Sequence, residues 1–161
     1  MNNQSLGERF VHSFGTRDWY TFEQIYDQDV VLYAPLAWKV AGFGPIRRVV
    51  EEFHTAYPGL HVELHDEFHS VDGTRVAFRF LMDWHNTGPF MGHEPTGDRG
   101  TTIETHTVRL REGRIIEQVV GANTLHMKYL EMVRWGMEFP KLTTDPAPAI
   151  VSSPPDPEPP S

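Results

Sequence analysis

The chain has 161 residues, of which 39% are hydrophobic and 12% aromatic, which fits one folded domain and excludes a disordered protein. Its 14 Lys and Arg against 22 Asp and Glu give a net charge of −8, which opposes binding to the phosphate backbone of nucleic acids. It has no cysteine, which excludes disulfides, thiolate catalysis and cysteine-bound metals. No apolar run is long enough to span a membrane, and no secretion signal opens the chain, so we expect a cytoplasmic protein.

The first part of the sequence is predicted to be mainly helical. Ser5 and Glu8 have the spacing of a capping box, and apolar residues at helical spacing follow them. A short second helix is expected at residues 21–26, before a β-like run at 29–33. A third helix is expected within residues 44–59, between the Gly-Pro pair that opens it and the Pro-Gly pair that stops it.

The hydrophobic period changes to two after residue 60. Four strands are predicted, at residues 60–70, 74–87, 101–110 and 114–122. Helical spacing returns at 123–135. Helices followed by an antiparallel meander predict an α+β fold, in which helices cover one face of a curved sheet and form a cone around a small-molecule pocket. We expect this domain at residues 1–140. Residues 141–161 are rich in proline and predict an extended tail, for which a partner-binding motif is the alternative.

The last predicted hairpin indicates which side chains share the pocket. If Glu112-Gly113 is a two-residue turn, each residue of 101–110 has a definite partner in 114–122, and partners point to the same face. The predicted pocket face comprises Glu104, His106, Val108, Leu110, Val119 and Asn123. A mainly apolar face with a few polar groups near one end is typical of a ligand pocket.

The strand at 60–70 places Asp66 on its apolar face. A buried carboxylate can act as an acid or a base, whereas the alternative is an Asp66 that is solvated or paired with an arginine. The opposite face alternates histidine and glutamate, but histidines four residues apart along a strand are too distant to share one metal ion. The histidines and glutamate at 85, 93 and 94 also lack ligand spacing, so we predict no metal site.

Three sequence segments resemble one enzyme family. Residues 84–99, WHNTGPFMGHEPTGDR, resemble the loop of SnoaL-like polyketide cyclases that typically reads GTHTGPF-x-G-x-PPTGR. Residues 108–118, VRLREGRIIEQ, resemble the family's FR-x-x-DGKI-x-E-x-W hairpin, and residues 53–60, FHTAYPGL, resemble its F-PDL segment. The resemblance spans residues 6–133. It implies the nuclear transport factor 2-like cone fold, catalysis without a cofactor, a small-molecule substrate and a homodimer.

This sequence departs from the family pattern at three positions. The aspartate that serves the family as acid or base for aldol closure is replaced by Asn123, which cannot carry a proton at neutral pH. The usual loop histidine is replaced by Asn86, with His85 adjacent, and the usual tryptophan is replaced by Val119. The resemblance therefore implies a cyclase scaffold that lacks its standard base.

The leading hypothesis is a cyclase of natural-product biosynthesis, of isomerase or lyase type, that folds a polyketide-like substrate against apolar walls. His106 is the best candidate for proton transfer, because histidine titrates near pH 7; a hydrogen-bonded core histidine is the alternative. Asn123 would bind a carbonyl or hydroxyl, or else only cap the final helix. Asp66 or Glu104 would orient His106 or act as the base. The predicted substrate-binding residues are Tyr33, Phe53, Phe80, Met82, Trp84, Asn86 and Val119, although Trp84 fits an ordinary core equally well.

Two other functions are compatible with the sequence. An epoxide-opening hydrolase or cyclase of the limonene-epoxide-hydrolase type needs a carboxylate base, an acid and an arginine in one pocket. Asp66, Asp83, Arg79 and Tyr33 supply those residue types. A non-catalytic small-molecule-binding protein is the third reading, which the missing aspartate favours and the polar groups of the pocket face oppose.

Overall fold

The computed structural model describes residues 4–34 and 37–122. The helix expected at 123–135, the candidate residue Asn123 and the proline-rich tail lie outside the described residues.

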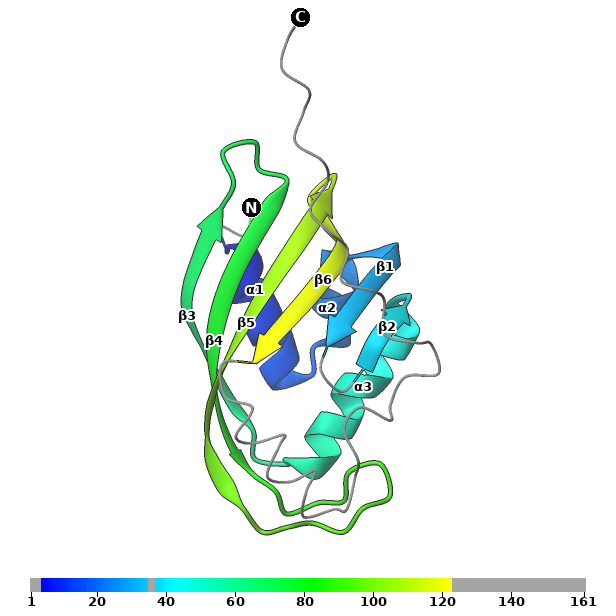
Figure 1. Ribbon diagram of the computed structural model, residues 1–161, viewed down its shortest axis with the longest axis vertical. Coiled ribbons are helices and arrows are strands. Elements are labelled where there is room, and N and C mark those ends of the chain that lie inside the picture. The colour runs from blue at the N-terminus through cyan, green and yellow to red at the C-terminus, as the bar shows by residue number, and fades with distance from the viewer. Residues whose placement is uncertain (1–3, 35–36, 123–161) are drawn as a thin grey trace, which may run out of the picture.

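The described residues form three helices and one six-stranded sheet (Figure 1). The helices are α1 (Leu6–Thr16), α2 (Trp19–Ile25) and α3 (Phe43–Ala56), and the strands are β1 (Tyr26–Ala34), β2 (Ala37–Ala41), β3 (His61–His69), β4 (Arg75–His85), β5 (Arg99–Arg111) and β6 (Arg114–Ala122). The strand order is β2-β1-β6-β5-β4-β3. The predicted α+β class is confirmed, but the sheet is mixed rather than wholly antiparallel, because β1 runs parallel to β6.

The helices lie where their apolar stripes can be buried. The predicted capping box of α1 is present, with the Glu8 amide donating to Ser5 Oγ (3.2 Å) and the Ser5 amide donating to the Glu8 carboxylate (2.7 Å). The α2 helix begins earlier than predicted, because the Asp18 carboxylate caps it by accepting from the Thr21 amide. The α1 helix packs against β3 and β4, whereas α3 packs against β1 and β2.

A cluster of aromatic rings joins α1 and α2 to the sheet. The Phe10 ring lies 5.1–5.8 Å from the rings of Phe14, Phe22, Phe78 and Phe80. The period of two predicted for residues 74–87 agrees with the burial of alternate side chains of β4 and of Asn86 just after it: Val76, Phe78, Phe80, Met82, Trp84 and Asn86. Burial of large aromatic side chains is the main stabilising contribution of this core.

An irregularity in β3 between Leu64 and Asp66 reverses the alternation of the strand. Leu64 points inward, but Asp66 pairs with Arg79 on the outer face and accepts two hydrogen bonds from its guanidinium. The hydrogen bond from Arg79 lowers the pKa of Asp66 below its ordinary value. The prediction that Asp66 faces the pocket is therefore wrong, and its alternative, an arginine partner, is confirmed.

The same shift turns Glu67 inward, away from the outer row of histidine and glutamate in which the alternation had placed it. Its Oε2 accepts hydrogen bonds from Ser5 Oγ (2.5 Å) and from the Gly7 amide (2.8 Å). A carboxylate beside the first turn of a helix is favourable, because the free amides there carry partial positive charge. Glu67 therefore anchors the beginning of α1 to β3.

The loop at 86–98 is fixed to the end of α3 by Asn86. The Asn86 Nδ2 group donates to the carbonyls of Ala56 and Gly88 (both 3.1 Å), and Asn86 Oδ1 accepts from the Thr96 amide (2.5 Å). Gly88 also donates its amide to Ala56. A Cβ atom at Gly88 would lie 1.9 Å from the carbonyl oxygen of Thr55, so only glycine permits this contact.

We predict that Gly88→Ala lowers the free energy of unfolding by about 2 kcal/mol, because the loop must move away from α3 to admit a methyl group. Gly44→Ala is the matched control, since no atom lies within 4 Å of a Cβ at Gly44, and it should change stability by at most about 1 kcal/mol. Urea denaturation of both variants measures the difference. Equal stability of the two variants would contradict the close approach of the loop.

Buried His54 connects α3 to α1, because its Nε2 lies 2.7 Å from the Phe14 carbonyl oxygen and donates to it. Burial lowers the pKa of His54 below its ordinary value of 6.5. The unfolded chain therefore binds more protons than the folded chain around this pH, so the contribution of His54 to stability is lost as the pH falls below about 6.5.

We predict that His54→Gln loses less stability between pH 7 and pH 5 than the wild type, since glutamine keeps a donor for Phe14 and does not titrate. His61→Gln makes the same exchange at an exposed histidine of β3 and is the matched control. Thermal melting at several pH values measures both variants. A His54→Gln variant with the same pH dependence as the wild type would refute this role.

Candidate active site

The β5–β6 hairpin positions the polar groups of the candidate site. Glu112 and Gly113 both have left-handed φ values, 53° and 77°, as the predicted two-residue turn requires. Beyond the turn, Leu110 pairs with Ile115 as predicted. The register then shifts by one residue, so that Arg109 pairs with Glu117 and Ile116 is the extra residue of a β-bulge.

The bulge changes which residues of β6 point inward. His106 pairs with Val120 instead of Val119, and Val108 pairs with Gln118. Val119 is 42% exposed on the outer face of the sheet, so the prediction that it lines the pocket is wrong. Gln118 is directed inward in its place and is buried.

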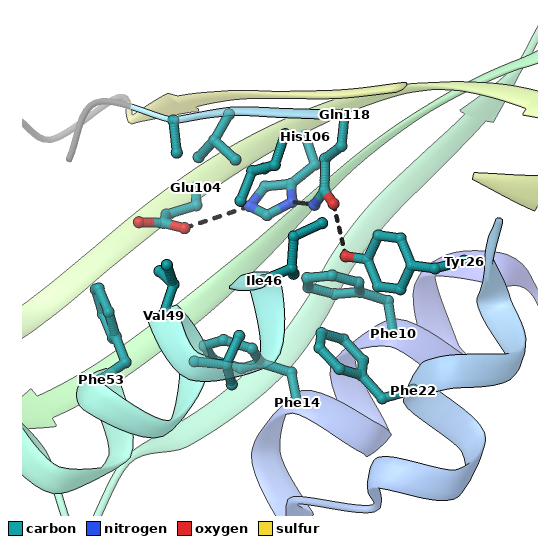
Figure 2. Close-up of a pocket in the computed structure, with 14 residues that line it drawn as sticks. Phe10, Phe14, Phe22, Tyr26, Ile46, Val49, Phe53, Glu104, His106 and Gln118 are labelled. Carbon is teal, nitrogen blue, oxygen red and sulfur yellow. Dashed lines mark hydrogen bonds and ion pairs between the residues drawn. The ribbon is translucent and has the colours of Figure 1, made fainter. Parts of the chain in front are cut away.

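A pocket lies between the inner face of the sheet and the three helices. It is lined by Phe10, Phe14, Phe22, Tyr26, Leu32, Ala34, Ile46, Val49, Val50, Phe53, Glu104, His106, Gln118 and Val120. Figure 2 shows Glu104, His106 and Gln118 along the sheet, and on the helices opposite it shows the apolar side chains Phe10, Phe14, Phe22, Ile46, Val49 and Phe53. The lining is that of a small-molecule site, mostly apolar with a few placed polar groups.

The polar members form one hydrogen-bonded chain (Figure 2). The Tyr26 hydroxyl donates to Gln118 Oε1 (2.6 Å), Gln118 Nε2 lies 2.6 Å from His106 Nδ1, and His106 Nε2 lies 3.3 Å from Glu104 Oε2. Glu104, His106 and Gln118 are 6%, 4% and 2% exposed. Burial also raises the pKa of Tyr26 far above its ordinary value, so its hydroxyl keeps its proton.

Aromatic rings enclose the imidazole of His106. The rings of Phe10, Phe78 and Phe80 have their centroids 5.0–5.1 Å from the His106 ring. Such surroundings exclude water from the imidazole and strengthen its hydrogen bonds. The second carboxylate oxygen of Glu104 points away from His106 in Figure 2. The site thus combines a buried acid–base pair, Glu104 and His106, with a wall of apolar groups.

The structure brings together three of the residues predicted for the site, since Glu104, His106 and Phe53 all line the pocket. Phe80 and Met82 are buried in the core beneath the pocket lining.

The other predicted residues of the described ranges lie elsewhere. Trp84 is buried and donates from Nε1 to Thr102 Oγ1, and Asn86 holds the loop described above. Tyr33 pairs with Val119 and alternates with the lining residues Leu32 and Ala34, which places it on the outer face.

Sequence reasoning missed Gln118 and Tyr26. A hairpin that continues without a bulge places Gln118 on the outer face. Tyr26 was placed at the end of a helix, whereas it is the first residue of β1. The one signal in the sequence is that Gln118 is the only uncharged polar side chain in the segment RIIEQVVGA, which fits a buried partner for another polar group.

The carboxylate–arginine set considered for epoxide opening does not meet in the pocket. Asp66 and Arg79 pair on the outer face, and Asp83 accepts from Thr101 Oγ1 (2.5 Å) at an exposed position. Within residues 4–34 and 37–122, no three His, Asp or Glu side chains gather as ligands for a metal ion. In the same ranges no helix has both the length and the hydrophobicity needed to cross a bilayer.

Several solved structures share this fold. AclR from Streptomyces galilaeus, a proposed hydroxylase, is 26% identical over 82% of this chain and 83% of its own, with a TM-score of 0.62. A proposed SnoaL-like polyketide cyclase from Jannaschia is 15% identical over 82% and 96% of the chains, with a TM-score of 0.63. IdmH from Streptomyces antibioticus, a proposed polyketide cyclase, is 22% identical over 74% and 91%, with a TM-score of 0.61.

A search among curated proteins gives no significant match. The family model of the SnoaL-like domain, in contrast, matches residues 8–118. This range includes most of α1, the elements from α2 to β5, the first part of β6 and the Glu104–His106–Gln118 cluster. The open, curved α+β sheet with its helices agrees with the nuclear transport factor 2-like fold that the sequence motifs imply. The chain belongs to the SnoaL-like domain family.

Proposed function

We propose that this protein is a cofactor-independent cyclase that closes a ring in a polyketide-like intermediate of natural-product biosynthesis. The observation that carries the proposal is the buried Glu104–His106 pair at one side of an aromatic-walled pocket. Membership of a family that includes polyketide cyclases supports the same substrate class.

Glu104 supplies a carboxylate where the family's aspartate is missing. Asn123 directly follows Ala122, and Ala122 is the register partner of Glu104. Glu104 therefore occupies the position on β5 that is opposite the last residue of β6. We propose that its carboxylate takes over the role of base that Asn123 cannot fill. His106 lies within 3.3 Å of it and stabilises the carboxylate charge by hydrogen bonding.

Glu104 then acts as the general base for an intramolecular aldol closure. Its carboxylate removes a proton from a carbon that is acidified by neighbouring carbonyl groups. The resulting carbanion adds to a carbonyl carbon of the same molecule, which forms the C–C bond and opens the C=O π bond. The new alkoxide takes the proton back from Glu104, so the ring closure is an isomerisation that needs neither oxidant nor metal.

The walls of the pocket provide the second contribution. Phe10, Phe14, Phe22 and Phe53 present rigid apolar surfaces opposite Glu104 and His106 (Figure 2). A flexible substrate chain that folds against them brings its reacting carbons together, which lowers the entropy cost of ring closure. Exclusion of water also protects the carbanion from being quenched.

We predict that Glu104→Gln and His106→Ala each lower turnover by about a hundredfold or more, the scale for one general acid or base. Glu63→Gln is the matched control, because Glu63 is an exposed carboxylate on β3. The assay substrate is a linear aromatic polyketide with a ketone and an acidic methylene group. Mass spectrometry follows ring closure by protein from which metal ions have been removed by exhaustive chelation. Folded Glu104→Gln protein with wild-type turnover would refute the assignment, and activity restored only by a divalent ion would refute metal independence.

A second candidate is hydroxylation of the same class of substrate, which the similarity to AclR favours. The mass of the product separates the two reactions. Ring closure leaves the mass unchanged or removes one water, whereas hydroxylation by dioxygen, with two electrons from an added reductant and release of one water, adds one oxygen atom. A protein that binds the substrate and returns it unaltered would instead be a binding protein.

We also propose that the protein works as a homodimer through the outer face of the sheet. This face exposes Phe68 (61%) and Val119 (42%) beside Ala77 and Thr107, with Arg75 and Arg109 at its margin. Large apolar side chains that lie together on a sheet face are typical of association surfaces.

We predict a dimer for the wild type and a monomer for Val119→Arg, because the arginine charge would be buried against a second copy. Val71→Arg changes a fully exposed valine outside the strands and should remain dimeric. Sedimentation equilibrium gives the mass of each. A monomeric wild type, or a dimeric Val119→Arg variant, would contradict the proposed surface.

A further inference from the structure

We infer that Gln118 is a positioning residue that fixes which nitrogen of His106 carries the proton. The assignment itself stands on the hydrogen-bonded chain, and its consequence for catalysis rests on the proposed function. Gln118 has no charge to give to the reaction, but it has both a donor and an acceptor on one rigid amide.

Tyr26 determines the orientation of the Gln118 amide. The Tyr26 side chain is buried and keeps its phenolic proton, which needs an acceptor. Gln118 Oε1 provides that acceptor at 2.6 Å. The NH₂ group of the same amide is therefore the one that faces His106, with Nε2 lying 2.6 Å from Nδ1.

The amide orientation then determines the tautomer of His106. A ring nitrogen that accepts from an N–H group cannot carry a proton itself, so Nδ1 is bare and the proton is on Nε2. Nε2 is the nitrogen that lies 3.3 Å from Glu104 Oε2, so the imidazole donates to the carboxylate. All three bonds of the chain run in one direction, from the Tyr26 hydroxyl to Glu104.

The reverse arrangement is unfavourable at each of its steps. If Nδ1 carried the proton, Gln118 would have to rotate and present its NH₂ group to the Tyr26 oxygen. The buried Tyr26 proton would then lose the acceptor at Gln118, and Glu104 would have to be protonated to donate to Nε2. An imidazolium would likewise place an N–H group against the Gln118 NH₂ group.

This arrangement prepares Glu104 for its role as a base. A neutral imidazole donates one hydrogen bond to the carboxylate and holds it in position, without the full ion pair that would weaken its basicity. Gln118 acts through His106, and Tyr26 acts through Gln118. The hairpin bulge that turns Gln118 inward is thus part of the site.

The test is ¹⁵N NMR of the histidine side chains in the free protein at pH 7, which reads the tautomer without any substrate. His54 is an internal reference for a protonated Nε2, because that nitrogen donates to the Phe14 carbonyl oxygen. The His106→Ala spectrum identifies the signals of His106. The wild type should show a pyrrole-type Nε2 and a pyridine-type Nδ1 for His106. A protonated Nδ1 in the wild type would overturn the inference.

Gln118→Glu places an acceptor at Nδ1 and should shift His106 to the imidazolium form, with both nitrogens pyrrole-type, while the His54 signals stay unchanged. It should also lower kcat by about tenfold or more with KM within about twofold. Gln24→Glu, an exposed glutamine in α2, should change neither the spectrum nor the kinetics. A folded Gln118→Glu variant with the wild-type His106 tautomer would overturn the inference, and the wild-type spectrum decides the matter if this variant does not fold.

The NMR measurement and the activity measurement distinguish failure of this inference from failure of the proposed function. The predicted tautomer in a protein without cyclase activity would support the inference and refute the function. Activity that depends on Glu104, in a protein whose His106 has its proton on Nδ1, would support the function and refute the inference.

Discussion

The pairing of β5 with β6 governs the chemistry of the pocket, because one extra residue in β6 decides which side chains point inward. Beyond Ile116 the register moves by one, so Gln118 and Val120 turn toward the helices and Val119 turns to the outer face. A hairpin without the bulge would present Glu117 and Val119 to the cavity. The position opposite Val108, from which Gln118 contacts His106, would then hold the carboxylate of Glu117 instead of an amide.

The polar chain that this register creates is stable only because its members satisfy one another. Tyr26, Gln118, His106 and Glu104 are all buried among phenylalanine rings, where an unpaired polar group costs about 1–3 kcal/mol. The same low-dielectric surroundings that impose this cost also strengthen the hydrogen bonds that are made. A network of this kind keeps one arrangement of the side chains, which is what proton transfer at a fixed atom requires.

Local sequence patterns predicted most of the cone. The capping box at Ser5 and Glu8, the alternation of β4 and the Glu112-Gly113 turn each depend on neighbouring residues, and the structure agrees with each. The parallel pairing of β1 with β6 could not be read in this way, because it joins segments more than eighty residues apart.

Two errors at the site, those at Asp66 and at Val119, have one physical cause. A strand bulge leaves no local signature in the sequence, yet each bulge inverts every side chain that follows it. The bulge in β3 moved Asp66 out to Arg79, and the bulge in β6 exchanged Val119 for Gln118. Glu104 and His106 were placed correctly on the inner face because β5 pairs with β4 without an interruption.

The central claim is that the Glu104–His106 pair removes a proton from an acidic carbon inside the apolar pocket. It is tested most directly by deuterium exchange from D₂O into an aromatic 1,3-dicarbonyl compound that cannot cyclise, followed by ¹H NMR. Exchange should be faster with the wild-type protein than in buffer and should return to the buffer rate with Glu104→Gln. Exchange at the buffer rate while the compound is bound to the wild-type pocket would contradict the claim.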